Sequence, residues 1–227
     1  QKSAWLFRIM SNSTIVDIGA HIAQLALQIG LPVQSILKAT IYEHFCGGED
    51  LAETGPTVMG LAEHDVSTIL DYGVEAKNTQ EEFDANLEEQ LRAIACADGN
   101  ASVPYVSCKI TGYAPFSLLE KCNTHAALDE EEQAAFERLL ARLHLICEAA
   151  ASSDVCLYVD AEESWIQDGI DRILTDRMRQ YNRDKPTVFN TLQMYRHDRL
   201  EFLKRAHQAA SEDGYILGVK LVRGAYM

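Results

Sequence analysis

One stretch near the end of the chain decides the fold class: Lys220-Leu221-Val222-Arg223-Gly224-Ala225-Tyr226 (residues 220–226). It follows an apolar run at residues 215–219, so an apolar strand leads directly into two cations, a glycine and a phenol. Strand alternation gives one face the positions of Lys220, Val222, Gly224 and Tyr226. Polar groups at the carboxyl end of an apolar strand are typical of sites in parallel (β/α) barrels.

The same pattern recurs four times upstream. Apolar runs cover residues 66–70, 104–108, 155–159 and 186–192, and each is followed by polar or charged residues, among them Asp71, Lys109, Asp160 and Gln193. A stretch with helical periodicity follows each of these runs. The alternation predicts five β/α units whose functional residues gather at the carboxyl ends of the strands.

The connecting segments predict amphipathic helices. Thr79 and Asp129 each open one, with acidic residues in the first turn. Two more are predicted over residues 164–181 and 198–210, with apolar stripes that include Trp165 and Leu200. The first sixty residues are also predicted to be helical, with a stripe from Ile15 to Ile29 and a second helix from Pro32 to Gly47-Gly48.

Four segments, taken in order, resemble a known family. They are Tyr-Val-Asp-Ala-Glu-Glu (158–163), Trp-Ile-Gln-Asp (165–168), Phe-Asn-Thr-Leu-Gln-Met-Tyr (189–195) and Gly-Val-Lys-Leu-Val-Arg-Gly-Ala-Tyr (218–226). Together they resemble proline dehydrogenase, most closely its bacterial stand-alone form, and the resemblance extends over nearly the whole chain. It implies a distorted (β/α)8 barrel, here as an N-terminal helical segment (1–64) and the first part of a flavin-binding barrel (65–227).

The resemblance also implies an activity and a set of site residues. The expected reaction is the oxidation of L-proline to Δ1-pyrroline-5-carboxylate by hydride transfer to N5 of a non-covalently bound FAD, with electrons passed to a quinone. This is the first step of proline catabolism to glutamate. By position, Lys109 and Asp160 would lie near the substrate and the isoalloxazine ring, and Tyr226 would pack against the bound proline. The flavin would be lined by Gln193, Lys220, Val222 and Gly224.

One departure from the family pattern is visible in the last strand. Many relatives read Arg-Leu-Val-Lys-Gly-Ala-Tyr, whereas this chain has Lys220 and Arg223 in the opposite order. Lysine is a point charge and arginine is a planar fork, so a bidentate contact to the flavin at position 220 is not expected. The exchange predicts a tuned flavin potential or affinity rather than a loss of chemistry.

The chain is also shorter than the implied fold. A full barrel takes about 250 residues, and in this family an arginine pair on the last barrel helix binds the substrate carboxylate. Five strands end before such a helix, so we expect a fragment that holds part of the flavin site and lacks the carboxylate clamp. An open sheet edge after the last strand would be prone to aggregation unless covered. The first residue, Gln1, predicts a trimmed N-terminus as well.

Composition excludes several classes of protein. The chain has 227 residues, 47% of them hydrophobic, and a formal net charge of -14, which favours a folded domain and disfavours binding to nucleic acid. The six cysteines show no CxxC spacing, so reduced and mostly buried thiols are expected. No HExxH and no GxGxxG motif occurs, which argues against a metal site and against Rossmann-type dinucleotide binding.

Location and two rival functions complete the expectations. The family resemblance implies a cytoplasmic protein in a bacterium, with peripheral contact to the inner membrane where the quinone lies, or a mitochondrial one in a eukaryote; the oligomeric state is left open. A barrel lyase could instead use Lys109 or Lys220 as a Schiff-base nucleophile. A non-catalytic barrel fragment that acts as a binding module is the other alternative.

Overall fold

The computed structural model describes residues 13–28, 46–72 and 78–224, together with the single residues 8, 11 and 42. The chain divides into two compact units, Gln1–Gly60 and Leu61–Met227. The division into an N-terminal helical segment (1–64) and a part of a flavin-binding barrel (65–227) stays a prediction.

Most of the described residues of the N-terminal part are helical. It contains α2 (Ser13–Gln28), which matches the predicted stripe, and α5 (Leu51–Ala62), which continues into the second unit. The helix predicted from Pro32 to Gly47-Gly48 lies almost entirely outside the described residues. Among the helices that the structure describes, none combines the length and the apolar character needed to cross a membrane.

Five parallel strands form one sheet in the second unit, as predicted. They are β1 (Ile69–Asp71), β2 (Tyr105–Cys108), β3 (Cys156–Val159), β4 (Val188–Gln193) and β5 (Val219–Val222), and they lie side by side in sequence order. The prediction that β1 begins at Val66 was wrong by three residues. A turn through Asp65, with φ of 57°, leaves Val66 exposed and outside the ladder.

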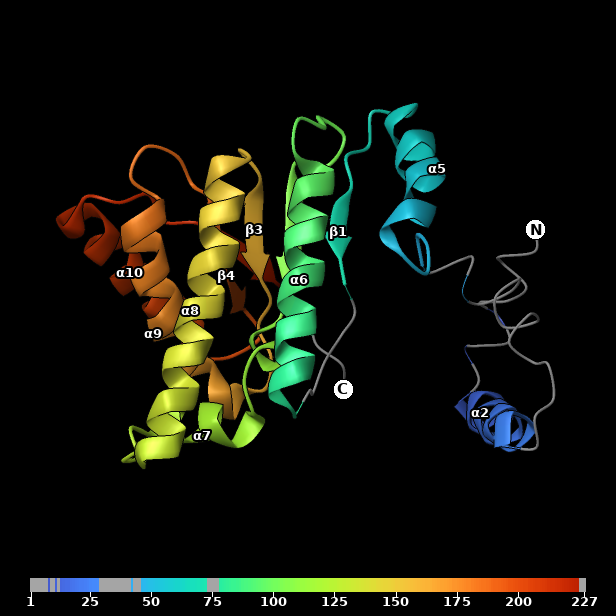
Figure 1. The fold of residues 1–227 in the computed structure, drawn as a ribbon, viewed down its shortest axis with the longest axis horizontal. Helices are drawn as coiled ribbons and strands as arrows, with labels where there is room; N and C mark the ends of the chain where they lie inside the picture. The colour runs from blue at the N-terminus through green and yellow to red at the C-terminus, as the bar shows by residue number, and fades with distance from the viewer. Residues whose placement is uncertain are drawn as a thin grey trace. The chain divides into compact units, whose positions relative to one another are not determined.

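Helices cover one face of this sheet (Figure 1). Helices α6 (Gln80–Ala97), α8 (Glu130–Ser152) and α9 (Ser164–Tyr181) lie on this face, and α10 (Arg199–Asp213) contacts β4. Helix α7 (Phe116–Thr124) packs against α9 and α8 instead. The predicted acidic openings are complete capping boxes, in which Thr79 pairs with Glu82 at α6 and Asp129 pairs with Glu132 at α8. Since α6 packs on β2, α8 on β3 and α9 on β4, each of these three helices covers a strand next to it in the chain.

Alternation along the strands separates the core from the opposite face. The side chains of Val106, Leu157, Val188 and Leu192 are buried beneath the helices with Phe83, Leu143, Ile146, Ile170 and Leu174. The residues between them point to the other face, where Tyr105 and Tyr158 stack at 4.6 Å and Phe189 packs edge-on against Tyr158. The polar residues at the strand ends continue this second face.

Three expectations about packing were wrong. Trp165 and Leu200 are 56% and 52% exposed, and each lies in the first turn of its helix. The Trp165 ring lies edge-on to Phe116 of α7, a helix that was not predicted. All six cysteines are free, but two of them, Cys108 and Cys147, are buried, whereas Cys122 and Cys156 are intermediate and Cys46 and Cys96 are exposed, so the expected burial of most thiols was wrong. Membership of an apolar stripe in the sequence therefore did not ensure that a side chain is buried.

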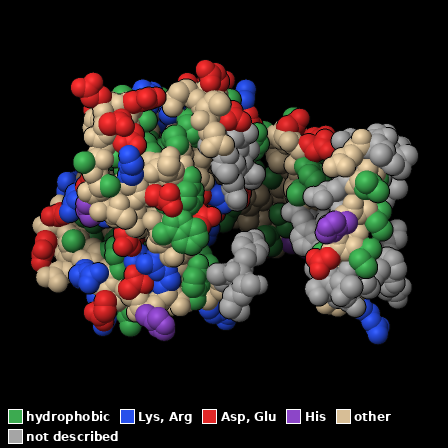
Figure 2. Space-filling model, turned by 90° about the horizontal axis from the view of Figure 1, so that it is seen from below, with side chains coloured by type: hydrophobic (Ala, Val, Ile, Leu, Met, Phe, Trp, Pro, Cys, Tyr) green, Lys and Arg blue, Asp and Glu red, His purple; other side chains and the backbone are tan. Residues whose placement is uncertain are grey.

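Charges of both signs are mixed on one face of residues 61–224. Figure 2 shows Asp and Glu side chains there interspersed with Lys and Arg rather than gathered into one patch. This face therefore offers no large field of a single sign.

Candidate active site

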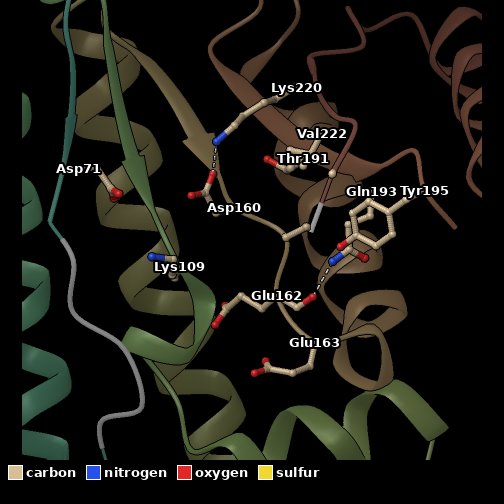
Figure 3. A pocket seen from close by; sticks show the side chains of 12 residues that line it. Asp71, Lys109, Asp160, Glu162, Glu163, Thr191, Gln193, Tyr195, Lys220 and Val222 are labelled. Atoms are coloured by element: carbon tan, nitrogen blue, oxygen red, sulfur yellow. Dashed lines mark hydrogen bonds and ion pairs between the residues drawn. The ribbon is translucent and has the colours of Figure 1, made fainter. Parts of the chain in front are cut away.

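The carboxyl ends of the five strands meet around one pocket. Its volume is about 570 Å³, and its lining consists of Asp71, Lys109, Asp160, Ala161, Glu162, Glu163, Thr191, Gln193, Tyr195, Lys220, Val222 and Gly224 (Figure 3). The parallel order brings these residues together, since each lies within a strand or follows one, and all five strands run in the same direction. Six of the seven predicted site residues line this pocket, and Tyr226 lies outside the described residues.

An ion pair joins β3 to β5 inside the pocket. Lys220 Nζ contacts Asp160 Oδ1, and the two side chains are 32% and 20% exposed. The ammonium also lies 5.6 Å from the centroid of the Tyr158 ring. Because both side chains are only partly exposed to solvent, their attraction is stronger than that of a fully exposed salt bridge. The contact fixes Asp160 at the point where β3 ends.

Glu162 is the second carboxylate of the loop after β3. It accepts a hydrogen bond from the main-chain nitrogen of Thr111 at 3.1 Å and another from the Thr111 hydroxyl. Burial raises the pKa of this carboxyl, while the two bonds from Thr111 and the charge of Lys109 oppose the rise. The loop is thereby tied to the 3-10 turn Ile110–Gly112, which follows Lys109.

Gln193 ends β4 with both ends of its carboxamide engaged. Nε2 donates to the main-chain oxygen of Glu162 at 2.6 Å, and Oε1 accepts from Arg196 Nη1 at 3.4 Å. Next to it, Thr191 Oγ1 is buried and has no hydrogen-bond partner within the described structure. A buried hydroxyl without a partner on the pocket wall is a candidate contact for a bound ligand.

The last strand provides space as well as charge. A side chain at Gly224 would meet no atom within 4 Å, so a ligand can approach the main chain there. Lys220 and Val222 line the pocket, while Leu221 is 58% exposed on the other face, as strand alternation predicted. Arg223 is exposed and does not line the pocket.

The pocket carries more negative than positive charge. Four carboxylates (Asp71, Asp160, Glu162 and Glu163) and two lysines (Lys109 and Lys220) give a formal charge of -2. This balance suits an uncharged ring system or a cationic amine, and it disfavours a phosphate or a free carboxylate at the same spot. A flavin would therefore place its ring here and its phosphates elsewhere.

Sequence reasoning missed several lining residues. Asp71, Glu162, Glu163, Thr191 and Tyr195 were not selected, although Thr191 lies within β4 and the other four stand at or just after a strand end. Their position was the available signal, because every polar residue at the carboxyl end of a parallel strand faces the same edge. The predicted roles of individual residues remain predictions.

The chain is similar to a known family and to several known proteins. A family model described as proline dehydrogenase matches residues 55–227. The carbapenem antibiotics biosynthesis protein CarD of Pectobacterium carotovorum subsp. carotovorum is 36% identical over 86% of this chain and 52% of its own length. The mitochondrial proline dehydrogenase 1 of Arabidopsis thaliana is 30% identical over 86% of this chain and 47% of its own.

A solved structure shares the fold. Proline utilization A from Bdellovibrio bacteriovorus, inactivated by N-propargylglycine, superimposes with a TM-score of 0.70 at 19% identity, covering 87% of this chain and 22% of its own. This likeness confirms the predicted fold class, a (β/α)8 barrel type of which five parallel strands are seen. The chain spans about half the length of the curated relatives it matches. By the extent of the family match, the chain belongs to the proline dehydrogenase family.

Proposed function

We propose that this chain contributes the flavin and substrate pocket of an FAD-dependent enzyme that oxidises L-proline to Δ1-pyrroline-5-carboxylate. The observation that carries the proposal is the convergence of Lys109, Asp160, Gln193, Lys220 and Gly224 on one pocket. They come from four different strands, so only the folded sheet unites them. The family match supports the choice of proline as substrate.

The pocket residues fit the ring of a flavin. Gln193, Lys220 and Val222 would line the ring, Gly224 would allow close approach of the main chain, and the Thr191 hydroxyl would gain a partner. A bound flavin would supply the acceptor for the hydride that leaves the carbon next to the proline nitrogen. The chain itself would orient the substrate and exclude water from it.

The charges suggest how the substrate would be held. Proline is a zwitterion, and the negative balance of the pocket would attract its amine toward Asp160 and Glu162. The positive charge of Lys109, which lies in the same pocket as Glu162 (Figure 3), would weaken this attraction. The described lining residues include no arginine, so the substrate carboxylate would bind elsewhere. Electron transfer to a quinone at a membrane surface is part of the same proposal.

The Schiff-base alternative makes a different demand on Lys220. Attack on a carbonyl needs the uncharged amine, whereas contact with Asp160 is the arrangement of a charged lysine. Borohydride reduction in the presence of a carbonyl substrate would trap an adduct only if the lyase alternative holds. The third possibility, a binding module without chemistry, predicts neither an adduct nor a bound flavin.

The test is the visible spectrum of the chain with FAD, recorded without oxygen before and after L-proline. Bound flavin that bleaches with proline supports the full proposal. If the flavin binds but stays oxidised, the cofactor site is supported, and the proposal that this chain alone oxidises proline is refuted. The variant Gly224→Val should weaken FAD binding, and Gly60→Val, at an equally open glycine of α5, is the matched control. Equal binding by both variants, or no binding by the wild-type chain, would refute the assigned site.

A further inference from the structure

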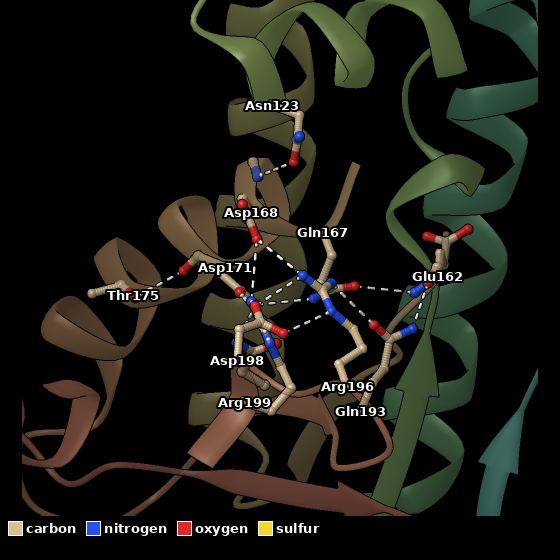
Figure 4. A network of polar contacts seen from close by, with 12 residues as sticks. Asn123, Glu162, Gln167, Asp168, Asp171, Thr175, Gln193, Arg196, Asp198 and Arg199 are labelled. Atoms are coloured by element: carbon tan, nitrogen blue, oxygen red, sulfur yellow. Dashed lines mark hydrogen bonds and ion pairs between the residues drawn. The ribbon is translucent and has the colours of Figure 1, made fainter. Parts of the chain in front are cut away.

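A buried polar cluster lies behind the pocket, between α9 and α10 (Figure 4). Gln167, Asp171 and Arg199 are 0%, 3% and 3% exposed. Asp171 Oδ2 accepts from Arg199 Nη1 at 2.6 Å, and Asp171 Oδ1 accepts from Gln167 Nε2 at 2.9 Å and from Asn190 Nδ2 at 2.8 Å. The buried carboxylate thus has one cation and two amide donors as partners.

The cluster reaches the pocket through the main chain of Glu162. The nitrogen of Glu162 donates to Gln167 Oε1 at 3.2 Å, and the oxygen of Glu162 accepts from Gln193 Nε2 at 2.6 Å. Both main-chain groups of one pocket residue are therefore held, one by the cluster and one by a pocket amide. The line of contacts runs from Arg199 through Asp171 and Gln167 to Gln193.

A second branch holds the other end of the Gln193 carboxamide. Arg196 Nη1 donates to Gln193 Oε1, and the guanidinium of Arg196 is itself held by Asp198, with contacts of 3.1 and 3.0 Å. Asp198 also contacts Arg199, so the two branches share an anchor. The pocket amide is thus supported from both sides by one network.

These contacts allow only one orientation of the amide. A flipped Gln193 would set Oε1 against the oxygen of Glu162 and the NH₂ group against the guanidinium of Arg196. Each end would then face a group of its own kind, two acceptors at one end and two donors at the other. In the observed orientation, one N–H of Gln193 and one lone pair of Oε1 remain for a ligand.

We propose that Gln167, Asp171 and Arg199 are positioning residues, which fix the Gln193 carboxamide and the Glu162 main chain so that the pocket presents a set pattern of donors and acceptors. None of the three lines the pocket, so they act through Glu162 and Gln193. The consequence for flavin affinity rests on the proposed function; the orientation of the amide does not.

The test compares two identical substitutions in the full chain. Gln167→Met removes both contacts of the relay at nearly constant volume. Gln90→Met makes the same change at an equally buried glutamine of α6, 3% exposed, which does not line the pocket. The first readout is the side-chain NH₂ signals of Gln193 in a ¹H–¹⁵N spectrum without cofactor, identified by their loss in Gln193→Leu.

We expect Gln167→Met to shift the Gln193 signals and to speed their hydrogen exchange, and Gln90→Met to leave them in place. Where the wild-type chain binds FAD, Gln167→Met should weaken binding about tenfold, the effect of one misplaced hydrogen bond, with no change in Gln90→Met. Because the first readout needs no flavin, a chain that fails to bind FAD still tests the positioning role.

Unmoved Gln193 signals in a folded Gln167→Met would overturn the proposal, since the cluster would then only support the fold. If Gln167→Met does not unfold cooperatively, Arg199→Lys is measured in the same way. It keeps the cation beside Asp171 but removes the planar fork that also reaches Asp198. Shifted Gln193 signals in this variant support positioning, and unchanged signals refute it.

Discussion

Asn182 is the residue whose loss should damage the site's scaffold most. It is fully buried at the end of α9, and its side chain makes four hydrogen bonds. Nδ2 donates to the oxygens of Val188 and Ile216 at 2.8 and 3.0 Å, and Oδ1 accepts from the nitrogens of Thr187 and Val188 at 3.0 and 2.8 Å. One amide therefore joins the start of β4 to the segment before β5.

The variant Asn182→Ala removes all four bonds and leaves their main-chain partners behind. At about 1 kcal/mol net for each bond, we expect the free energy of unfolding to fall by about 4 kcal/mol. With a urea dependence of about 2.5 kcal/mol per molar, the midpoint should move by roughly 1.5 M. Water entering the vacated space would reduce the loss.

Urea unfolding followed by far-ultraviolet circular dichroism measures this loss. The matched control is Asn123→Ala, because Asn123 Oδ1 accepts a single bond, from the nitrogen of Gly169 at 3.0 Å, and its loss should cost about 1 kcal/mol. Hydrogen exchange at the Thr187 and Val188 amides should also accelerate in Asn182→Ala. If the two variants lose the same free energy of unfolding, the loss does not scale with the number of hydrogen bonds removed, and the reasoning is refuted.

Three further predictions concern the contact between β4 and β5 and the pocket beside it. In Gly218→Ala the added carbon would lie 2.3 Å from the oxygen of Val188, so β4 and β5 must separate, and denaturation should show a loss of about 2 kcal/mol; a neutral variant contradicts this. Because burial raises the pKa of Glu162 above 4.5, the stability it contributes is present below that pH and lost as the pH rises through its folded pKa. Stability measured from pH 4 to 8 should therefore improve progressively in Glu162→Gln relative to wild type, and a constant difference would exclude this cause. In Lys220→Arg, the midpoint potential of bound FAD should change, since a planar fork replaces a point charge beside Asp160; an unchanged potential would defeat the idea.

The strand ends were predictable because one physical rule governs them. Apolar runs that end in Asp71, Lys109, Asp160 and Gln193 gave the strands, and parallel pairing then put those residues at a common edge. Helix α9 was predicted with its observed bounds because its apolar stripe is long and regular.

Other features depend on contacts between distant segments. Helix α7 has nine residues and too short a periodic pattern to stand out. Gln167, Asp171 and Arg199 look like ordinary polar helix residues in the sequence, and only the folded chain brings Arg199, at the start of α10, to Asp171 of α9. A polar side chain can be buried when another segment supplies its hydrogen-bond or ionic partner, and the periodicity of a sequence does not indicate which segment that is.

The sequential order of the strands bears on how the molecule assembles. Each of the five strands pairs with its neighbour in the chain, and α6, α8 and α9 each pack on a strand next to them in sequence. Contacts between units that follow one another in the chain favour folding in steps. The sheet can grow one β/α unit at a time as the chain emerges from the ribosome, with β5 added after β1 to β4. A defect in β5, such as Gly218→Ala, should then slow the addition of β5 and leave β1 to β4 able to form.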